Sequence, residues 1–154
     1  MVKVYDAYCG LYCGACFVMR LNESGNLEEG AQKWNIKPED VLCDGCKTEV
    51  RFIRCRECQF RDCAESKALN FCFECKEYPC KGFSNLPIDQ LPHLVSMLEN
   101  LEYIKKHGRD FWLKAQKQRW TCPQCGEKYS WYEQKCEKCG NRLNSYPKPP
   151  EQSE

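Results

Sequence analysis

The sequence predicts a small metal-stabilised α+β protein: an irregular, cysteine-rich zinc-knuckle module with short helices, a helical connector and a C-terminal zinc ribbon. Three observations predict this class. The 154-residue chain contains 15 cysteines. Most of them form C-x-x-C pairs, the spacing at which two sulfurs reach one tetrahedral ion. Apolar residues make up 42% of the chain with cysteine included, so a conventional core is small and needs staples such as metals or disulfides.

The cysteine spacing divides the chain into four parts. Residues 1–84 form the cysteine-rich multi-metal module, and residues 85–120 form an amphipathic helical connector. Residues 121–143 form the zinc ribbon, and the polar, proline-rich residues 144–154 are predicted to be a disordered tail.

Composition and charge favour metal-bound thiolates in a reducing cytoplasm. No signal-peptide pattern opens the sequence, the number of cysteines is odd, and no apolar run is long enough to span a membrane. The 23 Lys and Arg residues nearly balance the 22 Asp and Glu residues, so any case for a nucleic-acid partner depends on a local patch.

Short helices are expected throughout the N-terminal module. They are one that begins near Cys16 and ends within Asn22–Gly25, one over Asn26–Trp34, one that begins at Lys37–Pro38, one over Ala64–Leu69, and one that begins near Cys80. An alternation of apolar residues between Thr48 and Arg54 predicts a weak strand.

The connector carries the best apolar stripe of the chain. Leu91, Leu94, Val95, Leu98 and Leu101 have helical spacing, which predicts an amphipathic helix over residues 88–106. Gly108 interrupts it, and a further helix is expected over residues 111–118. We expect the stripe to pack against the metal core.

The ribbon prediction comes from two C-x-x-C-G knuckles. Its ligands are Cys122, Cys125, Cys136 and Cys139, and the segment Lys128–Tyr132 between the knuckles is expected to be a strand. Four thiolates make a closed site, so one zinc ion would have a structural role here.

The N-terminal module supplies eleven further metal ligands. Between Cys55 and Cys80 the pattern C-x2-C-x4-C occurs twice, offset by 17 residues. The candidate ligands are Cys9, Cys13, Cys16, Cys43, Cys46, Cys55, Cys58, Cys63, Cys72, Cys75 and Cys80. We expect two or three zinc ions, but spacing leaves the pairing of knuckles and the roles of Cys9, Cys63 and Cys80 open.

Two alternatives concern the metal and its ligands. Tetrahedral thiolate sites suit iron–sulfur clusters as well as zinc, although the bacterial ferredoxin spacing is absent. Either histidine, His93 or His107, could complete a three-sulfur site, but both lie among solvent-type residues and are interpreted as surface side chains.

Residues 8–83 resemble the cysteine-rich domain-of-unknown-function family 3795. The resemblance is carried by Tyr8–Cys16 (Y-C-G-L-Y-C-G-A-C), by Cys43–Cys46 (C-D-G-C), by both copies of the C-x2-C-x4-C pattern, and by the Lys81–Phe83 segment that follows. All eleven cysteines of the family pattern are present. The resemblance implies metal binding, with zinc as the expected metal, and implies no particular activity.

The function predicted from these patterns is that of a non-catalytic binding or adaptor protein with structural zinc sites and a protein partner. No acid–base pair, activated nucleophile or phosphate-binding loop stands out. One alternative is a metal- or thiol-dependent enzyme that uses an incompletely coordinated cysteine site. The second alternative is nucleic-acid binding by the ribbon and the basic segment of residues 105–119, which has six Lys or Arg residues and one acid.

Overall fold

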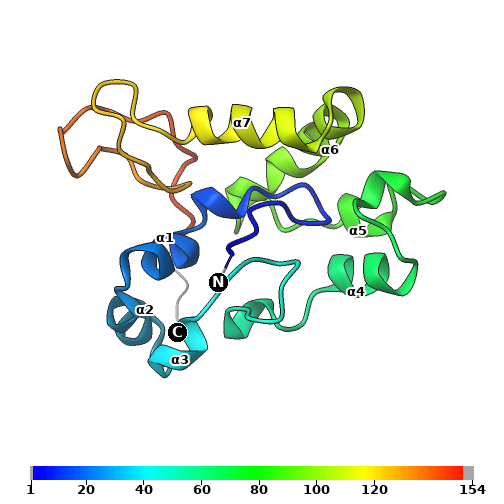
Figure 1. The fold of residues 1–154 in the computed structure, drawn as a ribbon, viewed down its shortest axis with the longest axis horizontal. Helices are drawn as coiled ribbons and strands as arrows, with labels where there is room; N and C mark the ends of the chain where they lie inside the picture. Colours follow the sequence, from blue (N-terminus) through cyan, green and yellow to red (C-terminus); the bar gives the residue numbers. More distant parts are fainter. Residues whose placement is uncertain (1, 151–154) are drawn as a thin grey trace.

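The computed structural model describes residues 2–150 and shows a mostly helical protein. Its α-helices are short and follow one another around the cysteine-rich turns (Figure 1). They are α1 (Phe17–Ser24), α2 (Leu27–Trp34), α3 (Pro38–Val41), α4 (Gln59–Ser66), α5 (Lys81–Ser84), α6 (Ser96–His107) and α7 (Arg109–Arg119). Single 3₁₀ turns lie at η1 (Cys13–Ala15), η2 (Ile53–Cys55), η3 (Cys72–Glu74) and η4 (Pro92–Val95).

The β component of the predicted α+β class is reduced to isolated bridges. Within residues 2–150 these are antiparallel bridges that join Asp6 to Tyr12, Thr121 to Lys128, and Lys135 to Arg142. No strand forms over residues 48–54, where Phe52 is instead buried against Trp34 and the η2 turn begins at Ile53. The strand expected at 128–132 is limited to the bridge at Lys128, because a turn begins at Trp131.

The first three helices form where local signals predict them. Gly25 ends α1 with a φ of 74°, and Asn35 ends α2 with a φ of 52°, the left-handed conformation that closes many helices. Pro38 occupies the first turn of α3, where its missing N–H costs no hydrogen bond. The helix expected over residues 64–69 begins earlier, at Gln59, because Cys58 adopts an extended conformation and serves as its N-cap.

The connector helix begins later than predicted and presents a different face. Residues 88–91 are not helical, Pro92 opens the η4 turn, and α6 begins only at Ser96. Leu94 and Leu101 are buried as expected, whereas Val95 is 55% exposed and Leu98 is 38% exposed. The buried face includes Met97, Asn100 and Ile104 instead.

Gly10 explains why this face of α6 is the buried one. Its φ is +90°, and a Cβ there would lie 2.5 Å from the carbonyl oxygen of Met97. The Asn100 side chain donates a hydrogen bond to the carbonyl of Gly10 at 2.8 Å. The loop that contains Cys9 therefore lies directly on α6.

One core joins the N-terminal loop, the connector and the C-terminal residues. Its buried members include Tyr12, Leu101, Trp112 and Cys122, and Trp112 is 1% exposed. A second, smaller core lies between α1, α2 and α3 and is closed by Phe52. In Figure 1, α7 runs along one side of the molecule and residues 121–143, coloured orange, continue from its end.

Among the helices of residues 2–150, none has both the length and the hydropathy that a membrane span requires.

Candidate metal centre

The four C-terminal cysteines converge on one point. The sulfur atoms of Cys122, Cys125, Cys136 and Cys139 all lie within 4.8 Å of one another. Cys122 and Cys139 are 3.6 Å apart, and Cys125 and Cys136 are 3.5 Å apart, so each short contact joins one knuckle to the other. We call these residues the four-cysteine site. Such a group of four sulfurs could hold one tetrahedral metal ion.

Matched backbone turns place these sulfurs. In the first knuckle Cys122 donates its N–H to the carbonyl of Glu127 at 2.7 Å, and Gly126 donates to the carbonyl of Cys122 at 2.9 Å. The second knuckle repeats both bonds with Cys136, Asn141 and Gly140, at 2.9 and 2.8 Å. Gly126 and Gly140 both have positive φ, 79° and 74°, which glycine adopts without strain. The local sequence therefore builds each half of the site independently.

At the four-cysteine site, the local electrostatics favour the thiolate form of Cys122 over that of Cys125. Burial opposes ionisation of Cys122, but the N–H groups of Cys125 and Gln124 donate to its sulfur and lower its pKa to about 6. The N–H of Glu127 favours the thiolate of Cys125, yet burial and the neighbouring sulfurs raise the pKa of that thiol to about 12. Cys122 therefore ionises first, and a metal that binds the site releases the protons of the other thiols.

Aromatic contacts fix the four-cysteine site to the rest of the chain. Trp131, between the knuckles, stacks on His93 with ring centroids 4.0 Å apart, and its N–H donates to the carbonyl of Ala15 at 3.1 Å. Tyr146, in the segment predicted to be a disordered tail, donates its N–H to the carbonyl of Trp131 at 2.8 Å. Residues 151–154 of that predicted tail lie outside the described residues.

The eleven N-terminal cysteines do not converge in this way. Among residues 2–150, no three of their sulfurs lie as close together as those of the four-cysteine site. Cys9 is buried, Cys55 and Cys63 are exposed, and the other eight are half-buried. The structure therefore shows one compact cysteine group and a more open set, which the spacing alone did not distinguish.

The pKa shifts of the N-terminal thiols reveal two neighbourhoods. In the first, burial and then the charges of Cys16 and Cys43 raise the pKa of Cys55 to about 12. Burial likewise raises the pKa of Cys13, followed by the charges of Cys16 and Cys46. Two different C-x-x-C pairs, Cys13/Cys16 and Cys43/Cys46, and one member of a third pair therefore lie near one another.

The second neighbourhood surrounds Cys72. Burial and then the charges of Cys80, Cys63, Cys58 and Cys75 raise the pKa of Cys72 to about 12. Cys9 links the two neighbourhoods, because burial first and the charges of Cys46, Cys58 and Cys72 after it raise its pKa. Cys9, Cys46 and Cys72 are far apart in the sequence, so spacing alone could not predict this grouping.

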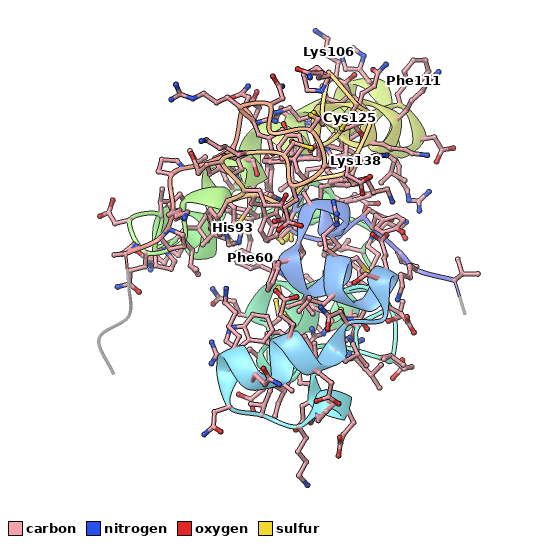
Figure 2. The ribbon with its side chains drawn as sticks, turned by 90° about the vertical axis from the view of Figure 1, so that its left-hand side faces the viewer. Phe60, His93, Lys106, Phe111, Cys125 and Lys138 are labelled. Carbon is pink, nitrogen blue, oxygen red and sulfur yellow. The ribbon has the colours of Figure 1, made fainter. Side chains whose placement is uncertain are left out.

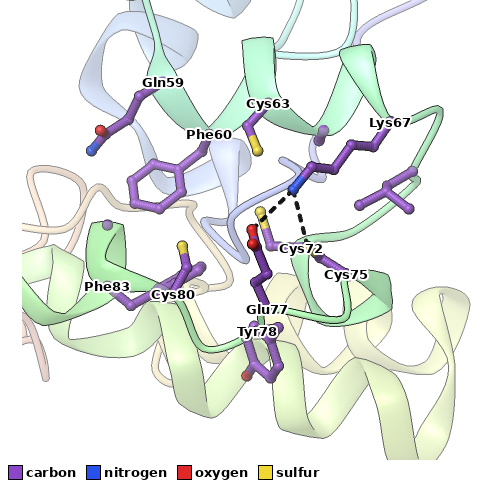
Figure 3. Close-up of a pocket in the computed structure, with 13 residues that line it drawn as sticks. Gln59, Phe60, Cys63, Lys67, Cys72, Cys75, Glu77, Tyr78, Cys80 and Phe83 are labelled. Atoms are coloured by element: carbon purple, nitrogen blue, oxygen red, sulfur yellow. Dashed lines mark hydrogen bonds and ion pairs between the residues drawn. The ribbon is translucent and has the colours of Figure 1, made fainter.

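Lys67 is a residue that sequence reasoning missed. Its Nζ donates to the sulfur of Cys75 at 3.3 Å and lies 3.4 Å from the carboxylate of Glu77 (Figure 3). The N–H of Glu77 and then the Lys67 ammonium lower the pKa of Cys75 below that of an ordinary thiol. The signal was present in the sequence, since Lys67 follows Cys63 by four residues and lies one helical turn beyond it.

The two histidines occupy different environments, and the surface assignment was wrong for His93. His93 is 9% exposed between Trp131 and Tyr132, and its Nδ1 is hydrogen-bonded to the Tyr132 hydroxyl. Burial lowers its pKa to about 4. His107 is exposed at the end of α6. Figure 2 shows His93 within the body of the protein, away from the labelled Cys125.

The fold and the sites define a small, mostly helical, cysteine-rich protein with one group of four cysteines that could hold a metal ion. Comparison with known families matches residues 5–85 to the family described as "Protein of unknown function (DUF3795)". Because this match covers more than half of the 154 residues, the chain belongs to that family. Comparisons with curated proteins and with solved structures give no match.

Proposed function

We propose that this protein is a non-catalytic zinc-binding adaptor whose metal ions are structural. The observation that carries the proposal is the convergence of four sulfurs within 4.8 Å from two knuckles of matched geometry. Four thiolates fill the coordination shell of zinc and leave no position for a substrate or an activated water. A site of this kind stabilises a surface for a partner, and we propose that the partner is another protein.

The proposal also assigns metal ions to the other cysteine-rich part of the chain. Residues 121–143 act as the zinc ribbon with one ion, and residues 1–84 hold two or three zinc ions on their eleven cysteines, joined through the connector of residues 85–120. Thiolate ligands require a reducing compartment, so we propose that the protein acts in the cytoplasm. The runner-up is a metal- or thiol-dependent enzyme that uses an incompletely coordinated site among Cys9, Cys63 and Cys80, and the exposure of Cys63 favours it.

The test is the zinc content of the full chain purified anaerobically. Cys125→Ser should lower the content by one zinc ion per chain, because three thiolates and a hydroxyl hold zinc less well than four thiolates. Lys138→Ala is the matched control, since Lys138 lies in the second knuckle but its side chain is 65% exposed. An unchanged zinc content in Cys125→Ser would refute a zinc ion at the four-cysteine site.

A second candidate function is nucleic-acid binding by the outer face of α7. Trp112 and Trp120 are buried, but Phe111 is 70% exposed. Lys114 and Lys117 follow it at three-residue intervals, and neither forms an ion pair within the part of the chain described. Figure 2 shows Phe111 and Lys106 projecting outward at the same end of the molecule. An exposed aromatic ring among unpaired cations is the arrangement that stacks a base and contacts a phosphate.

Filter binding to single-stranded RNA and DNA over a range of salt concentrations tests this candidate. Lys114→Glu should weaken binding and flatten its salt dependence, because one phosphate contact is lost. Lys37→Glu, an exposed charge reversal far from α7 in the sequence, is the matched control. Salt-sensitive binding that responds equally to both variants, or no binding, would remove this candidate.

A further inference from the structure

A cavity of about 240 Å³ lies between α4 and the segment that leads from η3 into α5. Phe60 and Cys63 face it from α4, and Tyr78 and Phe83 face it from the opposite wall (Figure 3). Phe60 and Phe83 contact each other with ring centroids 4.8 Å apart, and Tyr78 packs edge-on against Phe83 at 5.7 Å. These packed aromatic side chains therefore form an apolar part of the cavity lining.

Four thiols share this cavity. Cys63 comes from the last position of the first C-x2-C-x4-C copy, and Cys72, Cys75 and Cys80 make up the whole second copy. Their sulfurs surround the open space from both walls rather than meeting at one point, as the four-cysteine site does. The repeat therefore places four soft ligands around one accessible cavity, from α4 and from the neighbouring segment that leads from η3 into α5.

The backbone holds the second copy firmly against the N-terminal loop. Cys72 donates its N–H to the carbonyl of Tyr8 at 2.9 Å. The Glu74 carboxylate accepts the N–H groups of Asn70 at 2.7 Å and Phe71 at 2.6 Å, which caps the η3 turn. Cys72 and Cys75 are therefore presented by a fixed turn, whereas Cys63 approaches from within α4 and Cys80 from the N-cap of α5.

Lys67 supplies positive charge at the mouth of the cavity. Its ammonium donates to the Cys75 sulfur at 3.3 Å and is held by Glu77 at 3.4 Å. Four thiolates around a metal carry excess negative charge, and an N–H donor to one sulfur offsets part of it and orients the ligand. If the thiols bind a metal, Lys67 would offset part of this negative charge and orient the Cys75 thiolate.

We propose that Cys63, Cys72, Cys75 and Cys80 form a second, accessible thiolate metal centre, with Lys67 as a positioning residue that donates to the Cys75 sulfur. This inference rests on the proposed function, in which the cysteines bind metal, and it specifies which four act together. The centre would bind a metal that prefers thiolate ligands, either a zinc ion or the iron of an iron–sulfur cluster. Because the centre opens onto a cavity, its metal exchanges faster than the metal of the four-cysteine site.

The test follows metal release from the anaerobically purified full chain to a chromogenic zinc chelator. Release should occur in a fast phase and a slow phase. Cys80→Ser should reduce the fast phase and lower the metal content by one centre, and Cys63→Ser, from the opposite wall, should do the same. Cys125→Ser should remove the slow phase instead. Iron and acid-labile sulfide, measured on the same samples, distinguish a cluster from a zinc ion.

Lys67→Gln provides a test that leaves every cysteine in place. The variant should weaken metal binding in the fast phase by about 10-fold, as loss of an outer-shell hydrogen bond commonly does. Lys76→Gln is the matched control, because Lys76 is exposed and directly follows Cys75. Equal behaviour of the two lysine variants would overturn the role of Lys67.

The two proposals fail differently. If Cys80→Ser and Cys63→Ser both keep the full metal content and both release phases, the second centre is overturned, while loss of metal in Cys125→Ser still supports the proposed function. If all three variants keep their metal, both proposals are overturned.

Discussion

The two cysteine-rich regions of this protein present their thiols in different ways. In residues 121–143 four sulfurs lie within 4.8 Å of one another, and each knuckle is shaped by its own backbone hydrogen bonds. In the family domain, residues 5–85, eleven sulfurs lie in two loose neighbourhoods linked by Cys9. A C-x-x-C pair therefore fixes the position of its own two sulfurs, whereas a site assembled from distant pairs depends on the packing of the whole chain.

Removal of metal should produce the largest effect and should separate the two regions. A chelator under reducing conditions should take metal first from the open cysteines of the family domain and last from the four-cysteine site. Structural zinc contributes roughly 10–16 kcal/mol per ion, as much as the stability of a whole domain, so helical structure should be lost as metal leaves. Far-UV circular dichroism and metal content, measured on the same samples, check the order. Simultaneous release from both regions would contradict the distinction between them.

Trp112→Ala tests whether the two regions share one core. Trp112 is 1% exposed and packs edge-on against Tyr12 at 5.9 Å, in the same core as Cys122. The truncation should cost about 3–5 kcal/mol of the free energy of unfolding. Phe111→Ala, at the neighbouring exposed position, should change it by less than about 0.5 kcal/mol. Thermal melting of both variants would measure the difference, and equal melting temperatures would show that the core does not join the regions.

Asp6→Asn tests the polar link between the family domain and α7. Asp6 is 1% exposed, and its carboxylate pairs with Lys47 and Arg109, both at 2.8 Å. Burial opposes its ionisation, but hydrogen bonds from Arg109 and Lys47 outweigh burial and lower its pKa. Because both cations keep some contact with solvent, the variant should lose about 3 kcal/mol, the lower end of the effect for a broken buried pair.

The matched control for Asp6→Asn is Asp110→Asn. Asp110 also pairs with Arg109, at 3.0 Å, but its side chain is 93% exposed, so its loss should cost less than about 1 kcal/mol. Urea unfolding at neutral pH gives both values. A loss for Asp6→Asn no larger than that for Asp110→Asn would mean that the buried pairs do not stabilise the link.

His93 should make the contact between the η4 turn and the segment between the C-terminal knuckles sensitive to acid. Burial lowers its pKa from 6.5 to about 4, so between these values the unfolded chain binds a proton that the folded chain does not. Stability contributed by this group is therefore complete above pH 6.5 and falls as the pH drops toward 4. From pH 7 to pH 5 the wild type should lose about 2 kcal/mol more than His93→Phe.

Thermal melting of the wild type and of His93→Phe at the two pH values, with equal metal content, measures this loss of stability. It is the smallest of the predicted effects. His107→Phe is the control, because His107 is exposed at the end of α6 and its substitution should leave the pH dependence of the wild type unchanged. Identical pH dependence in His93→Phe and the wild type would exclude His93 as the acid-sensitive group.

The parts of the fold that local sequence determines were predicted well. Gly25 and Pro38 mark helix boundaries that the structure confirms, and the matched C-x-x-C-G spacing predicted the four cysteines that converge. Each of these features is set within a few residues by backbone conformation or by a short hydrogen-bonded turn.

The parts that long-range packing determines were not predicted. The buried face of α6 includes Met97 and Asn100 because Gly10 allows close approach at that point, which no periodicity reveals. His93 was assigned to the surface because the ring that covers it, Trp131, lies 38 residues later in the chain. The cavity with Cys63 and Cys80 likewise combines two segments whose contact is set by tertiary structure.

We propose that thiolate-bound metal ions replace the apolar interior that this chain is too short of apolar residues to build. Native mass spectrometry of anaerobically purified protein counts the metal ions on the folded chain and so tests this proposal. Every chain should carry several metal ions, with one fewer in Cys125→Ser. A fully reduced chain that is folded and monodisperse yet carries no metal would contradict it.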